Sequence, residues 1–214
     1  VTVVTLTTDF GTSDAYVPSM KGVILRLNPQ ASVIDITHDI EAQDVLQGAF
    51  VLGSAYRHFP PGTIHLVVVD PGVGTERRAM LLVTPEAYFI GPDNGVFSYV
   101  LADLSPNEAE PEVGVLRPYR WTPPQGTRAY HLNSRRWWLP RVSSTFHGRD
   151  IFAPVAAHLS LGVKAENMGE ETHYLEALYV PKPIWLDKRT LVGCILHIDR
   201  FGALVTSIRE GDLP

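Results

Sequence analysis

The sequence predicts an α/β protein with a three-layer α/β/α N-terminal domain built on a mostly parallel sheet, followed by a small β-barrel-like C-terminal domain that we expect to be incomplete. Two observations carry this prediction. Apolar runs alternate with segments of helical periodicity as far as Gly162, and only strand-like runs follow. We expect residues 1–165 to form the first domain and 180–214 to begin the second, with the boundary between about 162 and 182.

Strands are expected where short apolar, β-branched runs end at turn residues. In the first domain they span residues 1–7, 32–36, 66–69, 79–84 and 87–90. The run 66–69 has no polar alternation, which is typical of a strand covered on both faces of a parallel sheet. Strands alternating with helices predict such a sheet, because each parallel crossover needs a covering segment.

Helices are expected where apolar residues recur at a spacing of three to four. These segments are 15–27, 44–58, 96–104 and 151–161, the last with Pro154 near its first turn. Residues 105–127 are rich in Pro, Glu and Gly and are expected to form a loop. The stretch 128–145 holds two Trp and four Arg, and its sequence suits a packed helix, a trimer contact or a mobile flap.

The second domain is expected to contain strands at 191–199 and 204–208 around the turn Arg200-Phe201-Gly202. Cys194 lies in the first of these runs, where we expect a buried, small apolar residue. It is the single cysteine of the sequence, which excludes a disulfide framework and favours a reducing compartment. The expected location is therefore cytoplasmic.

Composition excludes several classes of function. The 214 residues are 45% hydrophobic and carry a formal net charge of −5, without the basic stripe that marks a nucleic-acid surface. No stretch approaches the roughly 20 apolar residues of a membrane span, and no signal peptide is recognisable. We expect neither nucleic acid nor membrane as a partner. The chain lacks an initiator Met and is expected to be part of a longer product.

The most informative local feature is an aspartate at the end of the run 64–69. Asp70 would emerge at the carboxyl end of a parallel strand, where open α/β sheets bind ligands. Gly72 and Gly74 allow a tight turn after it, and either Arg77 or Arg78 is placed to reach back to its carboxylate. The alternative is an ordinary strand-to-loop turn that Asp70 caps.

Other acidic residues follow predicted strands and offer a second interpretation, a shared acidic pocket. They are Asp9, Asp70 and Asp93, with Asp14 and Asp39 nearby. A metal site would need several of them to converge, together with His38 or His147. The sequence has no metal-ligand spacing, no dinucleotide fingerprint and no P-loop, so we expect neither a metal nor a nucleotide cofactor. His147 stands beside Gly148 at a helix entrance and is the best placed of the eight histidines for contact with a ligand.

Six segments, in order, resemble one family. They are Thr7-Thr8-Asp9-Phe10-Gly11, Met20-Lys21-Gly22, Asp70-Pro71-Gly72-Val73-Gly74-Thr75, Gly91-Pro92-Asp93-Asn94-Gly95, Phe146-His147-Gly148-Arg149-Asp150 and Ile198-Asp199-Arg200-Phe201-Gly202. Together they resemble the S-adenosylmethionine hydroxide adenosyltransferases, which are relatives of fluorinating and chlorinating enzymes. The resemblance extends over nearly the whole chain.

The resemblance implies attack by water or hydroxide on the 5′ carbon of S-adenosylmethionine, which gives adenosine and methionine without a metal or a cofactor. Asp70, Arg77 and His147 match the residues that surround the water in that family. The implied assembly is a homotrimer with active sites between subunits.

The same resemblance assigns substrate contacts. Asp9, Asp14 and Asp199 match ribose and methionine contacts, and Phe146 and Phe201 match residues that pack near the nucleoside. Two positions depart from the pattern: Gln43 replaces an aromatic residue of the halogenating relatives, and Ala203 replaces an Asn. The alternatives are a nucleoside-binding protein without activity, a metal-dependent phosphoesterase and, last, a halogenase.

Overall fold

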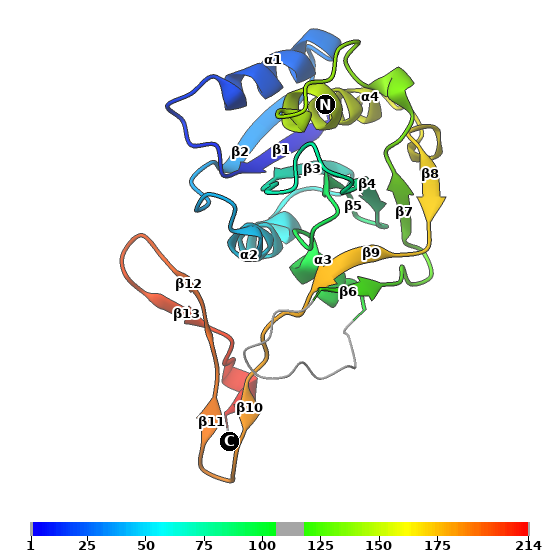
Figure 1. Ribbon diagram of the computed structural model, residues 1–214. Helices are drawn as coiled ribbons and strands as arrows, with labels where there is room; N and C mark the ends of the chain where they lie inside the picture. The colour runs from blue at the N-terminus through cyan, green and yellow to red at the C-terminus, as the bar shows by residue number, and fades with distance from the viewer. Residues whose placement is uncertain (1, 106–117, 214) are drawn as a thin grey trace.

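The computed structural model describes residues 2–105 and 118–213 and shows a central sheet between two layers of helices (Figure 1). The sheet has seven strands in the order β2-β1-β3-β5-β4-β7-β8. Their bounds are β1 Val3–Thr8, β2 Ser32–Thr37, β3 Thr63–Val68, β4 Ala79–Val83, β5 Ala87–Pro92, β7 Arg128–His131 and β8 Glu170–Thr172.

The sheet has a parallel half and an antiparallel half. Strands β2, β1, β3 and β5 pair in parallel, whereas β4, β7 and β8 are added antiparallel to their neighbours. All six residues of β3 are buried, as the absence of polar alternation predicted for its second half. Because β1, β2 and β3 run side by side in one direction, their carboxyl ends meet at one edge.

Helices cover both faces of the sheet (Figure 1). α1 (Tyr16–Leu27) and α4 (Ala153–Ser160) pack on the face that carries Leu66 of β3. α2 (Val45–Ala55) and α3 (Ser98–Leu104) pack on the face that carries Val67. These two hydrophobic clusters give the predicted three layers, and no helix in the described ranges is long and apolar enough to span a bilayer.

The described residues also form small antiparallel sheets beside the main one. β6 (Pro118–Trp121) pairs with β9 (Leu175–Leu178), and β9 contacts α3. The loop prediction for 105–127 is therefore wrong at residues 118–121, while 106–117 lie outside the described residues. The stretch 128–145 holds strand β7 and a 3-10 turn at Arg135–Trp137, so the packed-helix interpretation is also wrong.

The C-terminal part consists of two hairpins that extend away from the central sheet (Figure 1). β10 (Ile184–Trp185) pairs with β11 (Leu191–Val192), and β12 (Ile195–Ile198) pairs with β13 (Leu204–Thr206). This agrees with the expected β-rich second part. Cys194, however, is exposed, which corrects the expectation of a buried residue. Its apolar neighbours lie on hairpins with little to pack against, so local hydrophobicity did not translate into burial.

The domain boundary expected between about 162 and 182 contains two strands. β8 joins the edge of the central sheet, and β9 pairs with β6. Both strands therefore pair with strands from the N-terminal part of the chain.

Candidate active site

Asp70 and Arg77 form a buried, two-pronged ion pair at the carboxyl end of β3. Arg77 Nε donates to Asp70 Oδ1 at 2.8 Å, and Arg77 Nη2 donates to Oδ2. The side chains of Asp70 and Arg77 are 5% and 10% exposed, respectively. Such forked pairing strengthens the ion pair and holds the carboxylate in one orientation. The structure thereby chooses Arg77 over Arg78 as the partner of Asp70.

The turn after Asp70 brings Arg77 back to it. Val73 N donates to Asp70 O at 3.2 Å, and Thr75 N donates to Gly72 O at 3.1 Å. Gly74 adopts φ +78°, and a Cβ there would lie 2.4 Å from the backbone oxygen of Ser144. The turn therefore touches the loop that carries His147, and only glycine permits both the backbone angle and this approach.

Substituting Gly74→Ala is expected to destabilise the protein by on the order of 2 kcal/mol, from the strained backbone and the displaced Ser144 loop together. The matched control is Gly62→Ala, because Gly62 has φ +83° and a Cβ at that position would meet nothing within 4 Å. Urea unfolding of Gly62→Ala measures the cost of backbone strain alone. The additional loss of stability in Gly74→Ala then measures the cost of the steric clash. Equal losses at the two positions would show that the contact between turn and loop carries no energy.

His147 completes this arrangement from the other side. Arg77 Nη2 lies 2.9 Å from His147 Nδ1. A guanidinium can only donate, so Nδ1 is the acceptor and the neutral imidazole carries its proton on Nε2. Burial, and next the positive charge of Arg77, lower the pKa of His147 below its ordinary 6.5. The ring is therefore a neutral hydrogen-bond donor near pH 7.

Asp70 and His147 border a cavity of about 490 Å³, whereas Arg77 is not among its lining residues. Asp70, His147, Asp9 and Phe146 of the predicted site all line it. Asp9 follows β1, and its Oδ2 accepts from Gln43 N at 2.8 Å. Gln43 itself has φ +68°, an angle that residues other than glycine seldom adopt.

One wall of the cavity is aromatic and was not predicted in full. The rings of Phe10, Tyr16 and Phe146 lie in mutual contact, with centroids 5.0 to 5.8 Å apart. Phe10 stands in a turn and Tyr16 begins α1, so neither belongs to an apolar run that would have marked it. The signal that could have found Phe10 is its place directly after Asp9.

Three of the predicted substrate contacts lie outside this cavity. Asp14 is exposed on the segment before α1. Asp199 Oδ1 accepts from Phe201 N at 2.9 Å and from Ala203 N at 2.8 Å, so the carboxylate stabilises its own turn between β12 and β13. Phe201, at the tip of that hairpin, is 95% exposed.

The shared acidic pocket is formed only in part, because Asp9 and Asp70 line one cavity and Asp93 does not. Arg78 Nε donates to Asp93 Oδ2 at 2.8 Å, and Glu176 N donates to Oδ1 at 2.8 Å, which ties Asp93 to β9 rather than to Asp70. Burial raises the pKa of the Asp93 carboxyl. Among the described residues, no three His, Cys, Asp or Glu side chains are grouped so that they could hold a metal ion.

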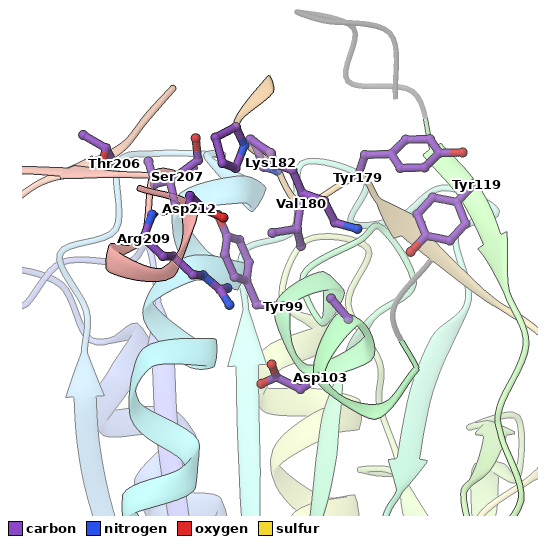
Figure 2. A pocket seen from close by; sticks show the side chains of 14 residues that line it. Tyr99, Asp103, Tyr119, Tyr179, Val180, Lys182, Thr206, Ser207, Arg209 and Asp212 are labelled. Atoms are coloured by element: carbon purple, nitrogen blue, oxygen red, sulfur yellow. Dashed lines mark hydrogen bonds between the residues drawn. The ribbon is translucent and has the colours of Figure 1, made fainter. Parts of the chain in front are cut away.

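A second cavity of about 490 Å³ lies between α3 and the C-terminal strands. Figure 2 shows Tyr99 of α3 beside Arg209, with Lys182 and Asp103 farther along the lining. Burial raises the pKa of Tyr99 to about 12. None of the predicted site residues lines this cavity, so the candidate active site is the one at Asp70.

The chain is similar in sequence to one family of known proteins and to its more distant relatives. Residues 4–169 match the family model of the SAM hydroxide adenosyltransferase N-terminal domain. A protein of Salinispora tropica named (R)-S-adenosyl-L-methionine hydrolase is 38% identical, over 93% of this chain and 69% of its own length. One of the same name from Methanocaldococcus jannaschii is 36% identical, over 99% and 68%. A fluorinase of an Actinoplanes species is 25% identical, over 99% and 73%.

Solved structures show the same relationship. The crystal structure of an uncharacterized conserved protein from Thermotoga maritima superposes with a TM-score of 0.80 at 38% identity, over 96% of this chain and 71% of that one. Because the family model matches well over half of the chain and the hydrolases are more than 30% identical over most of both sequences, the chain belongs to the SAM hydroxide adenosyltransferase family.

Proposed function

We propose that the protein hydrolyses S-adenosylmethionine to adenosine and methionine. The observation that carries the proposal is the linked set Asp70, Arg77 and His147, of which Asp70 and His147 line a cavity that also presents Asp9 and an aromatic wall. Family membership and the names of the relatives support the same reaction. The proposal includes no metal and no cofactor, and S-adenosylmethionine is the substrate.

In the proposed reaction, Asp70 orients a water molecule and draws off its proton as the oxygen attacks the 5′ carbon. The C5′–S bond breaks, and methionine leaves with the electron pair. Arg77 holds the carboxylate in a fixed orientation, while His147 donates its Nε2 proton to one lone pair of the water and leaves the other for attack. Positioning supplies most of the rate, since a sulfonium is already a good leaving group. Attack by hydroxide cancels charge, which a water-excluding cavity favours.

For the substrate, we propose that Asp9 binds ribose hydroxyls and that Phe146 packs on the nucleoside, because both line the cavity. Asp14, Asp199 and Phe201 are proposed as further contacts made in the assembled protein. We also propose a cytoplasmic location, for which the single cysteine is the support.

The function is tested by incubating the protein with S-adenosylmethionine and quantifying adenosine and methionine by chromatography. We expect the two products in equal amounts, at a rate that does not depend on added halide. Intact substrate would reject the proposal. Adenosine binding by calorimetry in that case would favour a binding protein, and a halogenated nucleoside would favour a halogenase.

We propose that the working form is a homotrimer in which the β12–β13 hairpin of one subunit completes the cavity of the next. The support is the position of Phe201, a large apolar side chain that is 95% exposed and does not line its own cavity. Exposed apolar side chains also crowd the hairpins nearby, among them Ile195, Ile198 and Leu204. Such surface marks a protein interface.

Mixed assemblies test this arrangement. Asp70→Asn and Phe201→Glu are each expected to be nearly inactive alone, and mixing them after mild dissociation should restore activity. Restoration follows if Asp70 of one subunit and Phe201 of another share a site, because some sites then contain both native residues. Light scattering should give the mass of a trimer. No recovery in mixtures shown to have exchanged subunits would place both residues in one subunit's site.

A further inference from the structure

A buried carboxylate behind the cavity organises the loop that carries Phe146 and His147. Asp150 is fully buried, in a π-helical turn at Gly148–Phe152. Its Oδ2 accepts from Ser143 N at 2.8 Å and from Ser143 Oγ at 2.9 Å. The carboxylate thus ties the start of the loop to its end.

Further contacts of this network lead to Phe146. Ser143 Oγ accepts from Phe146 N at 3.0 Å, which fixes the backbone of that residue. Arg149 Nε donates to Asp150 Oδ1 at 2.6 Å, and the Arg149 guanidinium lies 4.8 Å from the centroid of the Phe146 ring. Asp150 therefore holds Phe146 twice, through its amide and through its ring, although it does not line the cavity itself.

His147 is the next residue along the fixed backbone. The loop leaves little room to shift, since a Cβ on Gly148 would lie 3.1 Å from Met20 Sδ. Burial and the Arg77 charge lower the pKa of His147, while the negative charge of Asp70, then that of Asp150, and a backbone hydrogen bond of Ser143 act in the opposite direction and raise it.

We propose that Asp150 is a positioning residue for the active site, which acts through Ser143 and Arg149 to place Phe146 against the nucleoside and His147 against the attacking water. The proposal deepens the proposed function and rests on it for the identity of the substrate. It assigns Asp150 no contact with substrate.

Asp150→Asn is the sharpest test. An amide keeps the shape and one acceptor for Ser143, but its NH₂ then opposes the guanidinium of Arg149, donor against donor. We expect kcat/KM for S-adenosylmethionine to fall by about 10²-fold, since small displacements of positioned groups have effects of this size. KM should rise through Phe146 and kcat should fall through His147.

The matched control is Asp93→Asn. Asp93 is also buried, 2% exposed, and also accepts from an arginine and from a backbone amide, but it does not line the active-site cavity. Both variants should lose thermal stability, and Asp93→Asn should keep kcat/KM within about threefold. If the two variants lose activity in parallel with stability, Asp150 is merely structural.

Two further variants keep the test decisive should Asp150→Asn fail to fold. Ser143→Ala removes the link to the Phe146 amide, and Arg149→Met removes the group behind the Phe146 ring. We expect each to raise KM about tenfold, and unchanged KM values in both would overturn the proposal.

A readout independent of turnover separates this proposal from the proposed function. In protein with ¹⁵N-labelled histidine, the His147 ring is expected to titrate at lower pH in Asp150→Asn than in the native protein, and at unchanged pH in Asp93→Asn. An inactive native protein would reject hydrolysis while leaving this titration to decide on Asp150. An identical titration in all three proteins would show that the Asp150 charge does not reach His147, and together with unchanged KM values in Ser143→Ala and Arg149→Met it would reject the positioning role.

Discussion

Asp70→Asn is expected to lower kcat for S-adenosylmethionine hydrolysis by about 10³-fold, within the range that general-base catalysis contributes. The amide cannot take a proton from water, and it cannot accept from both Nε and Nη2 of Arg77 as the carboxylate does. Substrate affinity should change little, because the carboxylate is assigned to the water and not to the nucleoside. Single-turnover release of adenosine, with calorimetric binding of adenosine, separates the two effects.

Asp70→Asn leaves Arg77 without its carboxylate partner, and the control for this experiment must reproduce that loss. Removing one partner of a buried pair destabilises through the unpaired charge that remains. Asp93→Asn creates the same situation at Arg78, away from the cavity. Both variants should remain folded by circular dichroism, and only Asp70→Asn should be inactive. Retention of a tenth or more of the native kcat would remove Asp70 from the role of base.

Acidification is expected to destabilise the protein through His65. This side chain is fully buried in β3, where Nδ1 lies 2.8 Å from Thr5 Oγ1 and the ring stacks on Phe89 at 5.1 Å. Burial lowers the pKa of His65 from 6.5 to about 4. Between these values the unfolded chain binds a proton that the folded chain excludes, so stability falls as pH falls through this window.

The size of the effect follows from the two pKa values. The His65 contribution is complete above pH 6.5, about 2 kcal/mol of it is lost by pH 5, and about 3 kcal/mol is lost by pH 4. Urea unfolding at fixed protein concentration, at pH 7.5 and 5.0, measures the loss of stability on acidification. Because other titrating groups add their own pH dependence, the His65 contribution is the difference in this loss between variants.

Two variants isolate this histidine. Thr5→Val with His65→Leu removes both polar partners and should abolish the His65 part of the pH dependence. Thr5→Val alone keeps the buried imidazole and should retain it. If the double variant loses as much stability between pH 7.5 and 5.0 as the native protein, the acid sensitivity arises elsewhere.

The parts of the fold that rest on periodicity could be predicted from sequence. The strand ending at Asp70 and the helix 15–27 correspond closely to β3 and α1, since burial on one or both faces leaves a pattern along the chain. β6 was missed because its four residues, in a stretch rich in Pro and Gly, become a strand only through pairing with β9. Tertiary contacts determine whether such short segments form strands.

The candidate site likewise has features that could be predicted from the sequence and features that depend on tertiary contacts. The convergence of Asp9 and Asp70 follows from parallel strands, and was predicted. The local pattern left the choice between Arg77 and Arg78 open, because neighbours in an extended segment point to opposite sides and either could have faced Asp70. Only the family resemblance pointed to Arg77. The role of Asp150 was also missed, since its partner Ser143 is seven positions away and only the folded loop joins them.

The central position of β3 has a consequence for how the protein acquires its structure. Thr5 of β1 stands opposite His65 of β3, 60 positions later in the chain. Closing so long a loop is unfavourable until the pairing is complete, so parallel sheets of this kind fold slowly. Until it forms, the apolar strand β3 has no cover, and the nascent chain is exposed to aggregation at the strand that delivers Asp70.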